Sequence, residues 1–191
     1  MKVTIYGGTN NTEYTKAEKD DCVKLGTFLA KNGIEVLTGA CYGYPYYVGH
    51  AAAKAGGVVI GYSPALDLKE HIEKYKFPTD GVTKLEFIQS DGVSKADNFL
   101  RRSMDMSAYS DVVVAMGGSW GTYSELIFSF FYKKTIILIE KYDGATVAFQ
   151  ETWDFFDKRD NNPHVHNGAT ILRAKDIDEA CSLILKYQTS N

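Results

Sequence analysis

The sequence lacks the signals of a membrane or secreted protein. No apolar run in its 191 residues approaches the ~20 residues that a transmembrane helix needs. Only a short segment, KVTIY, precedes the first pair of glycines, and this is too short for the apolar core of a signal peptide. We therefore expect a cytoplasmic protein with no membrane partner.

Cysteine is scarce, and clustered metal ligands are absent. Cys22, Cys41 and Cys181 are far apart and include no CxxC motif, which disfavours a disulfide scaffold and a zinc site. Cys22 and Cys181 fall on the apolar faces of expected helices, whereas Cys41 stands in a glycine-rich loop. His164 and His166 would share one face of an extended segment, but no third ligand follows at a typical spacing. We expect no metal site.

The chain also lacks an excess of basic residues. It has 21 Lys and Arg against 24 Asp and Glu, a formal net charge of −3. Because broad attraction to DNA or RNA needs clustered Lys and Arg, we expect no nucleic-acid partner. A local basic group could still bind a single phosphate.

What the sequence does contain is a regular alternation of strands and helices. Runs such as VVIGY, VVVAM and TIILI are apolar throughout, which is typical of parallel strands covered on both faces by helices. Expected strands cover 2–6, 34–38, 58–62, 84–89, 111–116, 135–140 and 169–173. Expected helices cover 15–32, 47–55, 96–109, 122–131, 150–156 and 177–187, and 65–82 and 157–168 are expected to be irregular. We predict one α/β domain over 1–191, a doubly wound, Rossmann-like parallel sheet with helices on both faces.

Glycines follow three of the expected strands. Gly7 and Gly8 (with Thr9) end the first, a segment including Gly43 ends the second, and Gly117 opens the loop after the fifth. One such turn would be uninformative, because βα turns often use glycine. Three turns on one sheet edge predict a phosphate or nucleotide site, since ligands of these sheets bind beside the carboxyl ends of the strands.

The segment MGGSWGTYSEL, residues 116–126, holds the strongest candidate site. Glycines at the start of a helix let backbone N–H groups approach an anion, and the helix dipole adds partial positive charge. The spacing fits neither a Walker P-loop nor the GxGxxG fingerprint. The expected phosphate-binding residues are Gly117, Gly118, Ser119, Gly121 and Thr122, while Trp120 could stack on a base or pack over the loop.

One carboxylate and two arginines accompany this loop. Thr122 and Glu125 match the capping box S/T-x-x-E, so Glu125 could simply cap the helix. It could also act on a sugar attached to the bound phosphate. Arg101 and Arg102 are adjacent on the preceding helix, so only one of them faces a given site.

The pattern R-R…GG-x-x-G-T-x-x-E resembles the LOG-like family, whose members also carry the label "possible lysine decarboxylase". That family has an Arg-Lys pair on a helix, then a strand, then PGGxGTxxE. Counting back from the double glycine places Arg101 on the family arginine and Arg102 on its lysine, and Glu125 matches the final glutamate. The resemblance spans about residues 2–140 and is closest to the subgroup related to the molybdenum-cofactor carrier.

This resemblance implies hydrolysis of a nucleoside 5′-monophosphate to free base and ribose 5-phosphate. Arg101 and Glu125 would be catalytic, Arg102 and the glycine loop would bind the phosphate, and no cofactor would be required. The alternative is a non-catalytic carrier of a nucleotide or of the molybdenum cofactor. Two departures from the family pattern bear on this choice: Met116 replaces the proline, and the loop is one residue longer at Trp120.

The resemblance also implies a homodimer or higher homo-oligomer. The segment LIFSFFY, residues 126–132, is apolar on nearly every side, which predicts burial either in the core or in a subunit contact.

Overall fold

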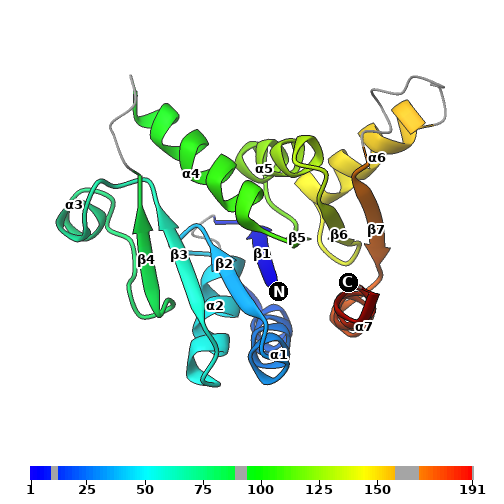
Figure 1. The fold of residues 1–191 in the computed structure, drawn as a ribbon, viewed down its shortest axis with the longest axis horizontal. Helices are drawn as coiled ribbons and strands as arrows, with labels where there is room; N and C mark the ends of the chain where they lie inside the picture. The colour runs from blue at the N-terminus through cyan, green and yellow to red at the C-terminus, as the bar shows by residue number, and fades with distance from the viewer. Residues whose placement is uncertain (10–12, 89–93, 158–167, 191) are drawn as a thin grey trace.

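The computed structural model describes residues 1–9, 13–88, 94–157 and 168–190. Its strands form one seven-stranded sheet in which every neighbouring pair is parallel, in the order β4-β3-β2-β1-β5-β6-β7 (Figure 1). The strands are β1 (Lys2–Gly7), β2 (Glu35–Thr38), β3 (Val59–Ser63), β4 (Lys84–Phe87), β5 (Val112–Met116), β6 (Thr135–Ile139) and β7 (Thr170–Ala174). The helices are α1 (Lys16–Lys31), α2 (Tyr44–Lys54), α3 (Leu68–Glu73), α4 (Lys95–Tyr109), α5 (Trp120–Phe131), α6 (Ala145–Asp157) and α7 (Ile177–Ser190).

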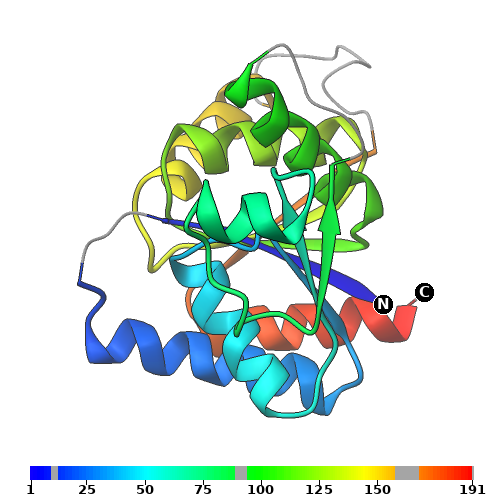
Figure 2. The same cartoon turned by 90° about the vertical axis from the view of Figure 1, so that its left-hand side faces the viewer.

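Helices cover both faces of the sheet, as the uninterrupted apolar strands predict. All five residues of β5 are buried, and successive side chains enter two separate clusters. Val112, Val114 and Met116 pack with residues of α1, α2 and α7. Val113 and Ala115 pack with residues of α4, α5 and α6. Figure 2 shows these two helical layers, below and above the sheet.

The chain winds outward twice from the centre of the sheet. It passes from β1 to β4 in one direction, returns to pair β5 with β1, and continues to β7 in the other. The register of the central pair runs from Val3 opposite Val112 to Gly7 opposite Met116. The predicted doubly wound fold is confirmed, and the switch point lies where β1 and β5 end together.

Several element boundaries differ from those expected, and local chemistry explains them. Helix α2 begins at Tyr44 because Gly43, at φ +105°, caps it and Pro45 fits its first turn. The region 65–82, expected to be irregular, contains α3, whose first turn is capped by the side chain of Asp67. Helix α5 starts two residues early, at Trp120. Most of the loop expected at 157–168 lies outside the described residues.

The apolar segment 126–132 is only partly buried. Leu126 is fully buried in the core, whereas the ring of Phe131 is 68% exposed and Tyr132 is also exposed. The core alternative therefore does not account for the whole segment, and the subunit contact stays a prediction. None of the helices in the described ranges is long and apolar enough to cross a membrane.

Candidate functional site

Three glycine-rich loops meet at the switch point. The amide of Gly8 donates to the carbonyl of Met116 (3.3 Å), which ties the loop after β1 to the end of β5. The carbonyl of Gly8 accepts from the amide of Tyr44 (3.1 Å) and from the hydroxyl of Tyr14 (2.8 Å). A Cβ on Gly43 would lie 2.0 Å from that carbonyl oxygen, so only glycine permits this approach.

The loop after β5 leads into a helix whose first amides have no side-chain cap. Gly117 and Gly118 have φ values of +65° and +96°, and the N-cap residue, Ser119, makes no capping hydrogen bond. Thr122 instead donates its hydroxyl to the carbonyl of Gly7 (3.2 Å). The amino end of α5 therefore presents uncapped N–H groups and partial positive charge, which suits an anion.

A cavity of about 270 Å³, which we name the central cavity, opens beside this helix end. It is bounded by the loop after β1, the loop after β2, α4 and the start of α5. Its lining consists of Gly7, Thr9, Cys41, Tyr42, Phe77, Phe99, Arg102, Ser119, Gly121, Thr122 and Glu125. Only two of these side chains are ionisable at neutral pH, Arg102 and Glu125, and they have opposite charge.

Arg102 and Glu125 form a buried ion pair on the wall of the central cavity. The Nη2 atom of Arg102 donates to Oε1 of Glu125 (3.3 Å), and its Nη1 donates to the carbonyl of Gly39 (3.0 Å). The two residues are 7% and 8% exposed. Burial raises the pKa of the Glu125 carboxyl, while Arg102 and the hydroxyl of Ser103 act in the opposite direction. The remaining polar atom of the guanidinium, Nε, is buried with no hydrogen-bond partner among the described residues.

A chain of hydroxyl groups holds α5 against α4 behind this pair. Ser103 donates to Oε1 of Glu125 (3.0 Å), and Ser129 donates to the backbone carbonyl of Glu125 (2.8 Å). The hydroxyls of Ser107 and Tyr6 are 2.7 Å apart, which extends the network to β1. Because each buried hydroxyl has a partner, the position of the Glu125 carboxylate is set by two helices and the central strand.

Glu125 is therefore not the capping residue that the T-x-x-E spacing suggested. The helix begins at Trp120, so Thr122 is already its third residue and Glu125 lies in the second turn. The carboxylate points across to α4 and bonds Arg102 and Ser103.

Arg102, rather than Arg101, is the arginine that reaches the site. Arg101 is exposed and does not line the central cavity. Residues 99, 102, 103 and 106 share one face of α4, and of these Arg102, Ser103 and Met106 are buried while Phe99 lines the cavity. The structure therefore does not bring Arg101, the expected catalytic arginine, to the central cavity.

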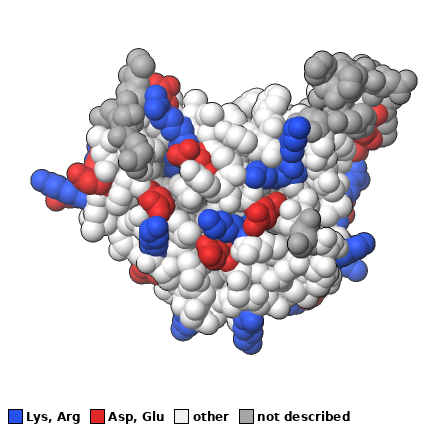
Figure 3. All heavy atoms as spheres, in the orientation of Figure 1, with Lys and Arg blue, Asp and Glu red and all other residues white. Residues whose placement is uncertain are grey.

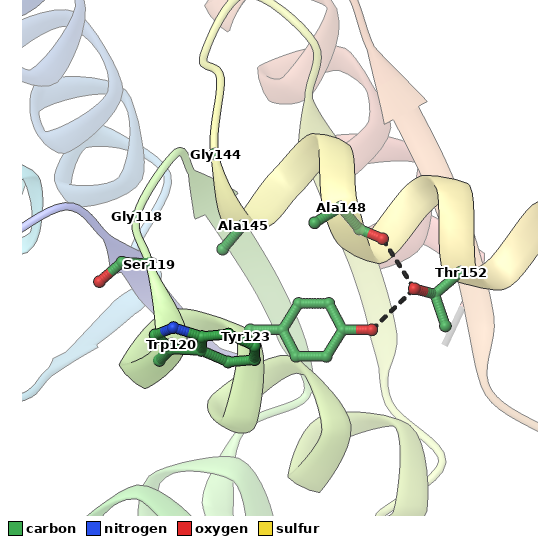
Figure 4. Close-up of a pocket in the computed structure, with 8 residues that line it drawn as sticks. All are labelled: Gly118, Ser119, Trp120, Tyr123, Gly144, Ala145, Ala148 and Thr152. Carbon is green, nitrogen blue, oxygen red and sulfur yellow. Dashed lines mark hydrogen bonds between the residues drawn. The ribbon is translucent and has the colours of Figure 1, made fainter.

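We name residues 117–119 the phosphate loop, after the ligand that the sequence predicts for them. A second cavity, the outer cavity, lies on the other side of this loop, between α5 and α6 (Figure 4). Its volume is about 520 Å³. Its lining consists of Gly118, Ser119, Trp120, Tyr123, Gly144, Ala145, Ala148 and Thr152. Ser119 lines both cavities, so the residues expected to bind phosphate stand between them.

The other residues expected at the site divide into three groups. Gly7, Thr9, Ser119, Gly121 and Thr122 line the central cavity. Gly118 and Trp120 line the outer cavity, and the indole of Trp120 is 87% exposed rather than packed over the loop. The rest, Gly8, Gly43 and Gly117, line neither cavity and lie where the loops make close backbone contacts.

Sequence reasoning missed two of the three aromatic residues that line the central cavity, Phe77 and Phe99. Phe99 lies one turn before Arg102 on α4, and its ring faces the guanidinium at 5.1 Å. The helical spacing of Phe99, Arg102 and Met106 could have identified it. Phe77 comes from the region expected to be irregular, and no local pattern indicates where it packs.

Cys41 is the cysteine that lines the central cavity. All three thiols are free and buried, and burial raises the pKa of Cys41, so its neutral thiol form is favoured. Within the described ranges no group of three or more His, Cys, Asp and Glu residues could hold a metal. His164 and His166 lie outside the described residues.

Comparison with known proteins relates the chain to one family and several structures. The model of the SLOG cluster4 family matches residues 1–171. The protein TM1055 is similar in structure, with a TM-score of 0.77 and 25% identity over 97% of this chain and 98% of its own. The molybdenum cofactor binding protein of the phototrophic bacterium Rippkaea orientalis has a TM-score of 0.69 and 22% identity, covering 97% of this chain and 95% of its own. No curated protein matches the chain.

The chain is also similar to a protein that binds nucleic acid. DNA processing protein A of Helicobacter pylori, described with a single-stranded DNA binding mode, has a TM-score of 0.66 and 21% identity over 97% of this chain and 80% of its own. At that identity the likeness shows the fold alone. On the face displayed in Figure 3, basic and acidic side chains are interspersed. The expectation that this chain does not bind nucleic acid stays a prediction.

Proposed function

The chain belongs to the SLOG cluster4 family, and on this premise we propose that it binds a nucleotide-like phosphorylated small molecule and hydrolyses its N-glycosidic bond. The observation that carries the proposal is the Arg102–Glu125 pair on the wall of the central cavity, beside the uncapped start of α5. Thr122, at the expected anion site, and Glu125 are 3 residues apart on the same helix. A sugar attached to the bound phosphate would therefore face the carboxylate.

Each residue has a defined part in this reaction. The amides of Gly121 and Thr122 would hold the 5′-phosphate, and the buried Nε of Arg102 offers one further donor. Water attacks C1′ as the bond from C1′ to the base nitrogen breaks, and the proton from water passes to the departing base. The ionised Glu125 would orient that water and stabilise the positive charge that develops on the sugar.

Arg102 acts here through Glu125 as well as on the ligand. Burial raises the pKa of the Glu125 carboxyl, and the guanidinium 3.3 Å away lowers it, which favours the ionised form that catalysis needs. Arg101, which is exposed, has no role in this proposal.

The test is release of free base from a panel of nucleoside 5′-monophosphates. Glu125→Gln keeps the shape and the hydrogen bonds of the side chain, and we expect it to lower turnover by about 10²–10⁴-fold. Glu151→Gln, the same change at an exposed position on α6, is the matched control and should leave turnover unchanged. Tight binding without turnover by the wild type would overturn the hydrolase proposal.

That outcome would favour a second candidate, a carrier for a phosphorylated cofactor such as the molybdenum cofactor. The similarity to a molybdenum cofactor binding protein supports it, although at 22% identity this likeness shows only the fold. The start of α5 and the unpartnered Nε of Arg102 fit the phosphate of such a cofactor. A carrier would bind the cofactor equally well in the wild type and in Glu125→Gln, because the Arg102–Glu125 pair would serve only as part of the wall of the central cavity.

A further inference from the structure

The outer cavity has the composition of a site for an uncharged ring. The described side chains and backbone that line it carry no charge, and two aromatic rings, Trp120 and Tyr123, stand at its edge (Figure 4). Its volume of about 520 Å³ lies within the range usual for small-molecule sites. The central cavity, in contrast, has an ion pair on its wall.

Trp120 is an exposed aromatic platform at this cavity. Its indole is 87% exposed, and its ring contact is an edge-on approach to Tyr123, with centroids 6.4 Å apart and planes at 73°. An indole face left in water gains free energy when a planar ligand covers it. Trp120 is also the residue by which this loop exceeds the length of the pattern GGxGT.

The far wall of the outer cavity is held by hydrogen bonds and offers a hydrogen-bond acceptor. The hydroxyl of Thr152 donates to the carbonyl of Ala148 (2.9 Å), so the Tyr123 hydroxyl must donate to Thr152 (2.8 Å). The oxygen of Tyr123 therefore keeps its lone pairs for an N–H donor. At the other end the amide of Ala145 donates to the carbonyl of Gly118 (2.9 Å), which fastens α6 to the phosphate loop.

We propose, building on the proposed function, that the outer cavity is a second ligand subsite for a planar, uncharged heterocycle bearing an amino group. This heterocycle belongs to the same ligand as the phosphate and extends from it on the side opposite the sugar that faces Glu125. Ser119 lines both cavities, so such a ligand crosses the phosphate loop at that residue. The preferred ligand class is accordingly a pyrophosphate-linked conjugate with a ring system at each end.

Two probes matched in base and sugar test this inference. Adenosine 5′-monophosphate reaches only the central cavity and the phosphate loop, whereas P1,P2-di(adenosine-5′) pyrophosphate also reaches the outer cavity. We expect the dinucleotide to bind more tightly by roughly 5- to 150-fold, the gain typical of one stacked base. Trp120→Ala should remove this gain and leave the affinity for the monophosphate unchanged.

Fluorescence gives a second readout, because the chain has only two tryptophans. In Trp153→Phe the remaining emission comes from Trp120, and the dinucleotide should quench it while the monophosphate does not. Phe131→Ala is the matched control, since it removes another exposed ring from the far end of α5 and should not alter either affinity.

The outcomes separate this inference from the proposed function. If neither probe binds, the phosphate site itself is refuted. If both bind with equal affinity, or if Trp120→Ala leaves the dinucleotide's advantage intact, the second subsite is refuted and the phosphate site stands. If Trp120→Ala instead changes the oligomeric state measured by light scattering, Trp120 is a subunit contact and the subsite is refuted as well.

Discussion

Removing the guanidinium of Arg102 should destabilise the protein in a pH-dependent way. In Arg102→Met, Glu125 stays 8% exposed but loses its counter-ion. Breaking one partner out of a buried ion pair costs about 3–5 kcal/mol. For a protein of this size that corresponds to a fall in Tm of about 6–20 °C. The carbonyl of Gly39 also loses its donor, which adds about 1 kcal/mol that does not depend on pH.

The sign of the pH dependence follows from the raised pKa of Glu125. The folded protein holds this proton to a higher pH than the unfolded chain does, so the free energy of unfolding falls as pH rises between the two pKa values. Without Arg102 the folded pKa rises further and the fall is larger. The penalty of Arg102→Met should therefore be greatest at neutral pH and small at about pH 3, which lies below the ordinary pKa of glutamate, so that Glu125 is largely protonated in both states.

Urea denaturation of four proteins at these two pH values measures the effect. The wild type, Arg102→Met, Glu125→Gln and the double variant form a thermodynamic cycle that isolates the pair. Adding Glu125→Gln to Arg102→Met should restore most of the stability at neutral pH, because no buried charge then remains. A penalty that is equal at both pH values and unaffected by Glu125→Gln would refute the electrostatic account of this site.

Three further predictions concern a loop glycine, the hydrogen bond from Tyr44 to Glu18, and the buried thiols. Gly118→Ala should abolish phosphate binding, and in urea denaturation it should cost more stability than the ~1 kcal/mol expected for Gly33→Ala. Both glycines have positive φ, but a Cβ on Gly118 would lie 2.2 Å from Oγ1 of Thr122, whereas a Cβ on Gly33 would meet open space. Equal costs for the two variants would contradict this reasoning. Tyr44→Phe removes the hydroxyl whose hydrogen bond does most to lower the pKa of Glu18. Between about pH 5 and about pH 3 the variant should therefore lose less stability than the wild type. An unchanged dependence of stability on acid pH would argue against that hydrogen bond. The three buried thiols should react with a disulfide reagent only when the protein unfolds locally or globally. A ligand bound in the central cavity should slow the reaction of Cys41 further, because Cys41 lines that cavity. Rapid modification of Cys41 in the ligand-bound protein would place the ligand elsewhere.

The fold was predictable from sequence because it depends on patterns that are local in the chain. A strand such as Val112–Met116 is apolar at every position, and that alone indicates a strand covered on both faces. Glycines after β1, β2 and β5 predicted a site at one edge of the sheet, and in the structure these three loops meet there. These features need no knowledge of which side chains meet.

The match to the family pattern gave the catalytic role to Arg101, whereas the structure brings Arg102 to the central cavity. Met116 is the last residue of β5 and pairs with Gly7. Counting back from the double glycine gives a position along α4 but does not say which face of the helix that residue lies on. The apolar spacing of α4, counted within the helix itself, points to Arg102.

The role of Glu125 could not be read from its neighbours in sequence either. The capping-box spacing is real, but a cap forms only where a helix starts, and α5 starts at Trp120. Its true partners, Arg102 and Ser103, lie on another helix more than 20 residues away. Phe77 reaches the same cavity through tertiary packing alone.

The ion pair in the central cavity has a consequence for how binding responds to ionic strength. Arg102 and Glu125 neutralise each other, so the described lining carries no net side-chain charge. Attraction to a phosphate then comes from backbone amides and the dipole of α5, which act at short range inside a desolvated site. Added salt should weaken binding far less than in a site lined by free lysines. Capture of the ligand would depend on fit rather than on long-range steering, as suits a protein of nearly balanced charge.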